Sequence, residues 1–391
     1  MNRWLRVLLA LAACWCLLVE TAECVAGRLF GMELDGDWFL LAVGSSSSAM
    51  GEFLSLYAWP LGAALAVVVA VATAIFLLAL KAPRKYFTAF ALAFLAYVGW
   101  SCRSPAAARG WKPLYVAWDT VRGARRYAEI VRAGEWTPDR AAAAAAATAP
   151  VDATNVVFVI GESMTCDRLS FFGYARHTMP RIEALGAAVA ISGPYRAWSP
   201  YTVNSLAALF IDRGESAAVR YRRAGYRTAF VTSHNRWTRY CSVEFAVFAA
   251  CERRIYLTEE FKGEHIYDDM LLPYVKELLA ADDGRPFCLF VHLMGSHFPP
   301  AARTRADYLA DSGLDDFDRS VRFTDETLAA IIAALPPRTT LVYMPDHGES
   351  TDRDGWRDFA SPALWSVPLM VYPASAAVPP GINIPSAMTQ H

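Results

Sequence analysis

The stretch NVVFVIGES, residues 155–163, is an apolar run that ends abruptly in polar residues. A second stretch, LVYMPDHGES at residues 341–350, has the same form and ends in Asp346, His347 and Glu349. Short, continuous apolar runs are typical of strands that are buried on both faces of a sheet. Carboxylates and an imidazole directly after two such strands indicate a functional site at the strand ends.

Between and after these two stretches, apolar runs alternate with helical patterns. This alternation predicts an α/β domain with a mostly parallel central sheet and helices on both faces. In such sheets the ligand site lies beyond the carboxyl ends of the strands. The predicted strands are 155–160, 226–232, 286–293, 340–345 and 367–372, and helical patterns cover 268–281 and 320–335.

The strand ends supply candidate metal ligands. Glu162 follows the first strand, Asp346 and His347 follow the strand at 340–345, and His292 and His297 lie at the end of the strand at 286–293. Carboxylate and imidazole ligands suit Zn²⁺, and Mn²⁺ or Mg²⁺ also accept such sets. An Asp-His pair alone is more often a helix cap, but several polar strand ends together favour a metal site. We interpret the remaining acid of the second stretch as an ordinary first-turn helix residue.

A nucleophile is predicted in SPYTVNSLAALF, residues 199–210, which has the pattern of a helix start. The first turn of a helix favours an anion, and a hydroxyl bound to a dication loses its proton more readily. Spacing alone does not separate Thr202 from Ser199 and Ser205, and an ordinary N-cap is the alternative for all three.

The N-terminal quarter is strongly apolar, whereas the whole chain carries a net charge of −1 and no basic field for nucleic acid. The apolar runs predict three transmembrane helices, at about 5–22, 59–80 and 86–102. The first could instead be a cleaved signal peptide. Basic residues before the first run and between the other two orient these helices, which predicts that everything after residue 103 lies outside the cytoplasm.

Three regions are predicted on this basis. They are a membrane domain at 1–102, a juxtamembrane connector with an Ala-rich linker at 103–150, and an outer catalytic domain at 151–391. In an oxidising compartment, Cys241 and Cys251 could close a short disulfide loop.

Five spaced motifs resemble those of the phosphoethanolamine transferases, in the alkaline-phosphatase/sulfatase superfamily. The first of them carries Gly-Glu-Ser, Ser-Phe, Gly-Tyr, Arg and Thr-x-Pro in the family's order. Three others resemble the family's His-x-Met-Gly-Ser-His, Ser-Asp-His-Gly-Glu-Ser and Tyr-Asp-Asn-Ser…Asp patterns, with Arg319 in the Asn place. These motifs are VIGESMTCDRLSFFGYARHTMPRI (159–182), TVNSLAALF (202–210), HLMGSHFPP (292–300), FDRSVRFTDETLAAIIAAL (317–335) and PDHGES (345–350).

The resemblance implies a role for each matching residue. Those matching the zinc ligands are Glu162, Thr202, Asp346 and His347, and Thr202 also matches the nucleophile. His297 and His292 match residues that contact the phosphoryl group or donate a proton, and Asn235 falls near a segment that binds the headgroup. Many members carry a further His about a dozen residues after the Asp-His pair, and this chain has none there. Members also continue past the strand at 367–372 into a final helix.

The activity implied by the resemblance is transfer of phosphoethanolamine from phosphatidylethanolamine to lipopolysaccharide or another glycan, with release of diacylglycerol. The enzyme would be a multi-pass protein of the bacterial inner membrane with its catalytic domain in the periplasm, in contact with membrane lipids. The alternatives are a phosphoglycerol transferase, a phosphatase or sulfatase on the same fold, or an inactive membrane homologue. A sulfatase would carry a Cys/Ser-x-Pro-x-Arg motif, which SPYTV lacks.

Overall fold

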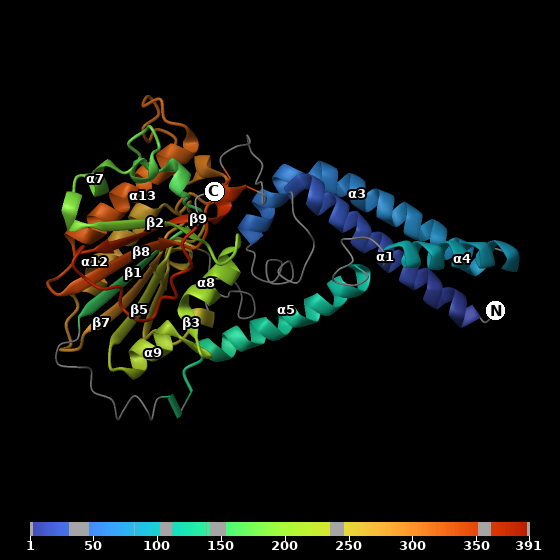
Figure 1. Cartoon of the computed structure of the whole chain (residues 1–391), viewed down its shortest axis with the longest axis horizontal. Coiled ribbons are helices and arrows are strands. Elements are labelled where there is room, and N and C mark those ends of the chain that lie inside the picture. The colour runs from blue at the N-terminus through green and yellow to red at the C-terminus, as the bar shows by residue number, and fades with distance from the viewer. Residues whose placement is uncertain are drawn as a thin grey trace. The chain divides into compact units, whose positions relative to one another are not determined.

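The computed structural model describes residues 3–30, 47–81, 83–101, 112–137, 139–140, 154–234, 246–350 and 361–388. The chain divides into two compact units, Met1–Arg126 and Tyr127–His391. Both are drawn in Figure 1. The boundaries predicted near residues 102 and 150 remain a prediction, because the segments around them fall largely outside the described ranges.

The first unit is helical, and one helix meets the requirements for a membrane span. Within the described residues, the segment Trp4–Val25 of α1 is long and apolar enough to cross a bilayer, and Gly62–Leu78 is a shorter apolar helical segment. The predicted second and third spans therefore remain a prediction. The helices of this unit are α1 (Arg3–Phe30), α3 (Ser47–Lys81) and α4 (Arg84–Ser101), and α5 (Lys112–Gly134) reaches into the second unit.

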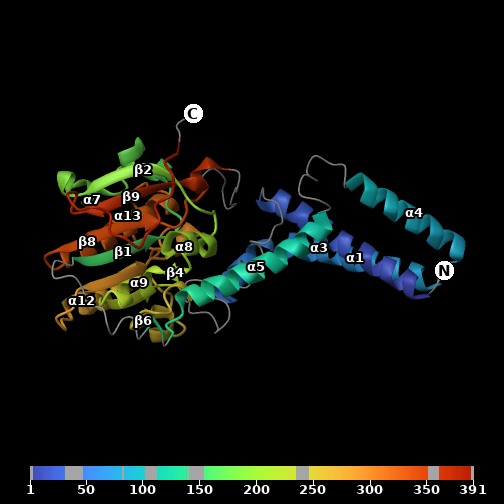
Figure 2. The same ribbon diagram turned by 60° about the horizontal axis from the view of Figure 1, so that its bottom comes forward.

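The second unit is built on a seven-stranded sheet with the order β2-β9-β8-β1-β7-β5-β6. The strands from β8 to β6 run parallel, whereas β9 runs opposite to both of its neighbours, β8 and β2. Strands β2 and β6 form the two edges (Figure 2). The bounds are β1 Asn155–Gly161, β2 Ala190–Arg196, β5 Arg227–Thr232, β6 Arg253–Tyr256, β7 Phe287–His292, β8 Thr339–Pro345 and β9 Ser366–Tyr372.

Helices cover both faces of this sheet because successive strand residues point to opposite sides. On β1, Val156 and Phe158 join one hydrophobic cluster with residues of α8 (Thr202–Phe210) and α9 (Ala217–Arg223). Val157 and Val159 join a second cluster with residues of α12 (Leu272–Ala280) and α13 (Asp316–Ala333). Figure 1 shows the two helix pairs on opposite sides of the sheet. The predicted α/β class with a mostly parallel sheet and helices on both faces is confirmed for this unit.

Several short elements complete the unit. A two-stranded ribbon pairs β3 with β4. The remaining bounds are β3 Ile211–Asp212, β4 Glu215–Ser216, α7 Pro180–Glu183 and α11 Leu257–Glu260, with 3-10 turns at Cys166–Arg168, Ser170–Phe172, Gly186–Ala188, Asp268–Leu271, Pro300–Ala302 and Pro362–Trp365.

Candidate metal centre

The candidate site forms at the carboxyl ends of adjacent parallel strands. In the sheet register, Ile160 of β1 lies beside His292 of β7 and Met344 of β8. The residues that follow these positions therefore emerge at the same edge. Glu162 follows β1 and Asp346 follows β8, so residues far apart in sequence become neighbours, as the strand-end rule predicts.

Four of the predicted residues contact one another at this edge. The hydroxyl of Thr202 donates to Oε2 of Glu162 at 2.9 Å and lies 3.4 Å from Nε2 of His347. The same Nε2 lies 3.3 Å from Oε1 of Glu162 and 3.4 Å from Oδ2 of Asp346. Both carboxylates and the imidazole are buried. Ligand atoms around one tetrahedral zinc stand roughly 3.4 Å apart, from bond lengths near 2.1 Å, so these four side chains match the spacing of a single ion.

The orientation of His347 suits the binding of a cation at this place. Its Nδ1 lies 2.7 Å from the carbonyl oxygen of Gly348, so Nδ1 carries the hydrogen and donates it. Nε2 then points at the two carboxylates, an arrangement that either a proton on Nε2 or a bound metal cation makes favourable. This orientation by a backbone carbonyl is the usual second-sphere arrangement of a metal-binding histidine. Oδ2 of Asp346 is also buried and accepts no hydrogen bond of ordinary geometry among the described residues.

The carboxylates of Glu162 and Asp346 lie so close together that they do not both ionise readily. Burial and the neighbouring charge of Glu162 raise the pKa of Asp346 well above its usual range. Burial also acts to raise the pKa of Glu162, but nearby imidazoles, His347 foremost, hold it below its usual range. Like charges at this separation keep one group protonated unless a cation offsets them. The donor set and its charge thus fit a divalent metal ion.

A left-handed residue, hydrogen bonds and a close glycine contact fix the backbone around Glu162. Ser163 has a positive φ of 58°, and its backbone N–H donates to Oδ1 of Asp346 at 3.3 Å. The hydroxyl of Ser163 donates to Oε1 of Glu162 at 2.6 Å. Gly295 packs closely against Glu162. A Cβ added at Gly295 would stand only 2.5 Å from the carbonyl oxygen of Glu162. Strain of this kind at a left-handed non-glycine residue is typical of functional sites.

The structure separates the three hydroxyls that spacing alone left open. Ser205 donates to the carbonyl oxygen of Ser199 at 2.9 Å, and the hydroxyl of Ser199 accepts from the N–H of Tyr201. Thr202 is the first residue of α8, and its hydroxyl lies in the metal cluster. A helix N-terminus at this point also favours an anionic group.

The other three predicted site residues are His292, His297 and Asn235, and the structure describes the first two. His292 is fully buried, with Nε2 4.0 Å from Oε2 of Glu162. His297 lies close enough to affect Glu162, and its Nδ1 lies 2.8 Å from the carbonyl oxygen of Phe298. Asn235 lies outside the described residues.

Two further sequence interpretations also have outcomes. Glu349 lies in a non-helical stretch at 347–350, and whether a helix starts after it falls outside the described residues. The carboxylate of Glu349 accepts from the N–H of Ser350. Cys251 is buried, and the predicted pairing with Cys241 remains a prediction because Cys241 lies outside the described residues.

One residue of this site was missed from the sequence. His234 stands two positions after β5, and its ring stacks on that of His292 with centroids 4.0 Å apart. Donor atoms of His234, His292 and Glu162 all lie within 4.8 Å of one another. The rule that selected Glu162, a polar residue just past a buried strand, would have selected His234 as well.

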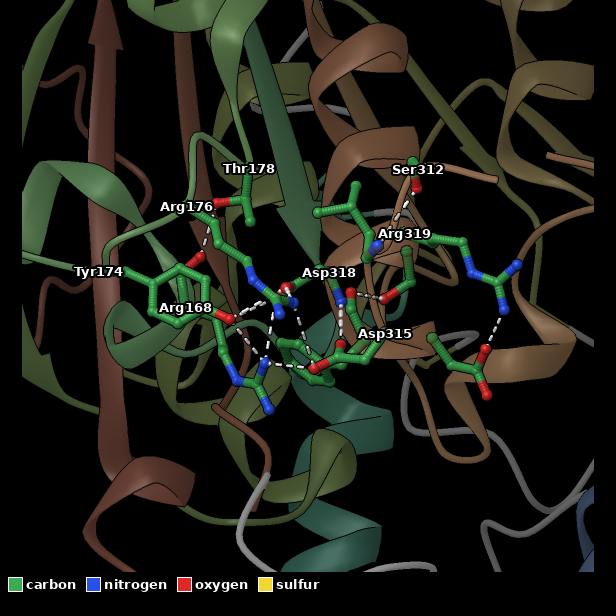
Figure 3. Close-up of polar contacts among 12 residues, drawn as sticks. Arg168, Tyr174, Arg176, Thr178, Ser312, Asp315, Asp318 and Arg319 are labelled. Carbon is green, nitrogen blue, oxygen red and sulfur yellow. Dashed lines mark hydrogen bonds and ion pairs between the residues drawn. The ribbon is translucent and has the colours of Figure 1, made fainter. Parts of the chain in front are cut away.

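Motif residues away from the cluster form an ion network around the buried Asp318 instead (Figure 3). Asp318 of α13 is fully buried and accepts from Arg168 at 3.1 Å, from the Tyr174 hydroxyl at 2.9 Å and from Arg176 at 2.6 Å. Arg168 also pairs with Asp315 at 2.7 Å. The network joins the segment after β1 to the start of α13 and so supports the loop that follows Glu162.

Comparison with known proteins agrees with this architecture. The sulfatase family model matches residues 154–387, which is more than half of the chain. The chain belongs to the sulfatase family. Among curated relatives of this sulfatase-family chain, YhbX of Escherichia coli K12 is 26% identical over 238 residues, 55% of this chain and 42% of YhbX. The Kdo(2)-lipid A phosphoethanolamine 7''-transferase of the same strain is 24% identical over 255 residues, 57% of this chain and 45% of that enzyme. The sulfatase-family chain thus spans less than half the length of these relatives.

Solved structures show the same fold. The integral membrane protein lipooligosaccharide phosphoethanolamine transferase A (EptA) from Neisseria meningitidis aligns with a TM-score of 0.55 at 16% identity, covering 93% of this chain and 76% of that one. The periplasmic domain of EptC from Escherichia coli, in complex with Zn, aligns with a TM-score of 0.51 at 22% identity, covering 57% and 73%. At these identities the likeness shows that this sulfatase-family chain shares their fold.

Proposed function

We propose that this chain is a membrane-anchored phosphoethanolamine transferase that uses Thr202 as its nucleophile. The observation that carries the proposal is the contact of the Thr202 hydroxyl with Glu162 and His347 inside a buried carboxylate–imidazole cluster. The relatives named as phosphoethanolamine transferases support the group transferred. Zinc is the proposed ion, because EptC was solved with Zn and the donor set suits it; Mn²⁺ also suits such a set.

In the proposed first step, the Oγ1 of Thr202 attacks the phosphorus of phosphatidylethanolamine. The new bond is Thr202 Oγ1–P, and the bond that breaks is P–O to the glycerol. The hydroxyl proton goes toward Oε2 of Glu162, which already accepts it at 2.9 Å. Diacylglycerol leaves after its oxygen gains a proton. A zinc ion bound to these residues would lower the pKa of the hydroxyl and offset negative charge at phosphorus.

In the proposed second step, an acceptor oxygen attacks the same phosphorus from the opposite side. The Thr202 Oγ1–P bond breaks and Oγ1 regains its proton from Glu162, while the acceptor hydroxyl gives its proton to His297 and leaves with phosphoethanolamine. His297 is the proposed proton donor to the diacylglycerol oxygen, with His292 as a second contact to the phosphoryl group. The carbonyl of Phe298 holds the Nδ1 hydrogen of His297, which leaves Nε2 for this exchange. Asn235 is the proposed contact to the ethanolamine group.

The proposed setting is the bacterial inner membrane, with the second unit in the periplasm. The apolar helix Trp4–Val25 is consistent with a membrane anchor, and the runs at 59–80 and 86–102 are proposed as further spans. An anchor suits a reaction whose donor and released product are both lipids. The proposed acceptor is a lipopolysaccharide component, in lipid A or core, or another glycan.

The experiment that tests this proposal follows lipid cleavage. Full-length protein in detergent micelles is supplied with zinc and fluorescent phosphatidylethanolamine, and diacylglycerol is measured over time. We expect release by the wild-type protein and a loss of at least 1,000-fold for Thr202→Ala, because removing a nucleophile removes the covalent route. Thr202→Ser should keep partial activity, since it retains a hydroxyl at the same place.

Two results would contradict the proposal. Equal release by Thr202→Ala and the wild-type protein would show that another group attacks phosphorus. Absence of release from zinc-loaded wild-type protein, with phosphatidylglycerol cleaved instead, would favour the phosphoglycerol transferase alternative.

A further inference from the structure

Asp268 joins the loops that follow two strands of the sheet, and the mechanism above gives it no role. It begins the 3-10 turn Asp268–Leu271 and is only 4% exposed. Its Oδ1 accepts from the hydroxyl of Ser233, the residue after β5, at 2.6 Å. The backbone N–H groups of Met294 and Gly295, just after β7, donate to Oδ1 and Oδ2 at 2.8 Å each.

The three partners of Asp268 are all donors, so each of these contacts needs an oxygen that accepts. A carboxylate satisfies them together, because both of its oxygens accept. An amide in its place would turn an NH₂ group toward one of the donors. Burying a carboxylate is costly, and the three hydrogen bonds offset part of that cost. The residue type is therefore matched to the turn that it holds.

The turn that Asp268 holds leads to the proposed proton donor. The backbone N–H of His297 donates to the carbonyl oxygen of Met294 at 3.1 Å, so the residues that Asp268 binds also place His297. The same turn contacts the metal cluster, because the N–H of Ser296 donates to the carbonyl oxygen of Glu162 at 2.9 Å. A proton donor is effective only within hydrogen-bond reach of the oxygen that it protonates.

The alternative is that Asp268 only ties two loops together and stabilises the fold. Both interpretations use the same hydrogen bonds, but they predict different chemistry. A loss of stability or of the metal centre lowers the rate alike for every donor molecule. Misplacement of the proton donor lowers the rate only where the leaving oxygen needs a proton.

We propose that Asp268 is a positioning residue that acts through His297, by fixing the turn 293–297 so that the imidazole reaches the leaving oxygen of the donor lipid. This inference rests on the proposed function. In that step Oγ1 of Thr202 bonds to phosphorus and the P–O bond to the glycerol breaks. The hydrogen on Nε2 of His297 passes to the glycerol oxygen as diacylglycerol leaves.

The test compares two donors that differ in their leaving group. Full-length, zinc-loaded protein in detergent receives either phosphatidylethanolamine or the para-nitrophenyl ester of phosphoethanolamine, whose nitrophenolate leaves without a proton. For Asp268→Asn we expect diacylglycerol release to fall roughly 10- to 100-fold, which is part of what a positioned acid supplies. Nitrophenolate release should stay within about threefold of the wild-type rate, because its departure does not use His297.

Asp269 provides the matched control. It is the next residue of the same turn, and it pairs with Arg305 at 2.8 Å near the surface. Asp269→Asn should leave release from both donors unchanged. A second comparison adds Asp268→Asn to His297→Gln, and the further loss of diacylglycerol release should be less than about threefold, because the group through which Asp268 acts is already gone.

Hydrogen exchange of backbone amides, followed by mass spectrometry of peptides, gives a readout that needs no activity. The amides of Met294 and Gly295 should be protected in the wild-type protein, because both donate to a buried carboxylate. Their exchange should become at least about tenfold faster in Asp268→Asn and stay unchanged in Asp269→Asn.

The possible failures point to different errors. Equal losses with the two donors, or a full additional loss in the His297→Gln background, would overturn this inference and leave the proposed function intact. Rapid exchange of both amides in the wild-type protein would also overturn it, even if Asp268→Asn does not fold. Wild-type protein that cleaves neither donor would instead refute the proposed function, and with it the role of Asp268 in catalysis.

Discussion

At the scale of single residues, Glu162 is the centre of the site. Its two oxygens face different partners, His347 on one side and Thr202 with His292 on the other. Such a carboxylate works only if its backbone is held still, because metal affinity depends on ligand placement within a fraction of an ångström. Its carbonyl oxygen accepts from the N–H of Ser296 at 2.9 Å, which ties it to the turn after β7.

Gly295 in that turn gives a prediction at this scale. Its φ is +51°, and an added Cβ would stand 2.5 Å from the carbonyl oxygen of Glu162. We expect Gly295→Ala to cost roughly 2–4 kcal/mol of stability, from left-handed strain and overpacking together. Because Glu162 must shift, zinc affinity should fall by roughly 10- to 100-fold. Urea unfolding and zinc titration measure the two effects.

Gly284 offers the matched control for this prediction. Its φ is +79°, but nothing lies within 4 Å of an added Cβ. Gly284→Ala should therefore show only the strain, about 1 kcal/mol, with zinc affinity unchanged. Equal zinc affinities for the two variants would refute the role given to Gly295.

At the scale of elements, the ion network around Asp318 holds the loop after β1 against α13. We expect Asp318→Ala to destabilise the second unit by roughly 2–4 kcal/mol, because the largely buried guanidinium of Arg168 loses its fully buried partner and keeps only the more exposed Asp315. Arg176→Ala should cost about 1 kcal/mol or less, since that side chain is 46% exposed. Chemical denaturation of each variant measures the difference, and similar losses for the two would contradict the network's assigned role.

The elements also show what the sequence can and cannot predict. Buried strands such as β1 and β8 were predicted almost to the residue, because continuous apolar runs leave few alternatives. Strand β2 was missed, since AISGPYR lies at a half-exposed edge and contains Gly193 and Pro194. The antiparallel direction of β9 could not be predicted either, because the sequence of an apolar strand does not show whether it runs parallel or antiparallel to its neighbours.

The sequence also predicted only part of the candidate site. Sequence patterns placed Glu162, Asp346 and His347 at strand ends, and the structure brings them together with Thr202. His234 also follows a predicted buried strand and was overlooked, whereas its proximity to Glu162 follows only from the sheet order that places β5 next to β7. Conversely, Tyr174 and other residues of the first motif belong to the ion network instead of the cluster.

At the scale of the whole molecule, the chain combines a helical unit that contains an apolar helix with a sulfatase-family unit that contains the whole candidate site. The described residues of the candidate cluster, from Glu162 to His347, all belong to the second unit. The proposed role of the first unit is to keep the site close to its lipid donor.

The central claim is that phosphoethanolamine passes through a covalent bond to Thr202, and intact-protein mass spectrometry tests it most directly. Zinc-loaded full-length protein is incubated with phosphatidylethanolamine without acceptor, and the modified residue is located by peptide fragmentation. We predict one added phosphoethanolamine group on Thr202, absent from Thr202→Ala and from chelator-treated protein. Release of diacylglycerol without an adduct, or an adduct on a different residue, would contradict the account.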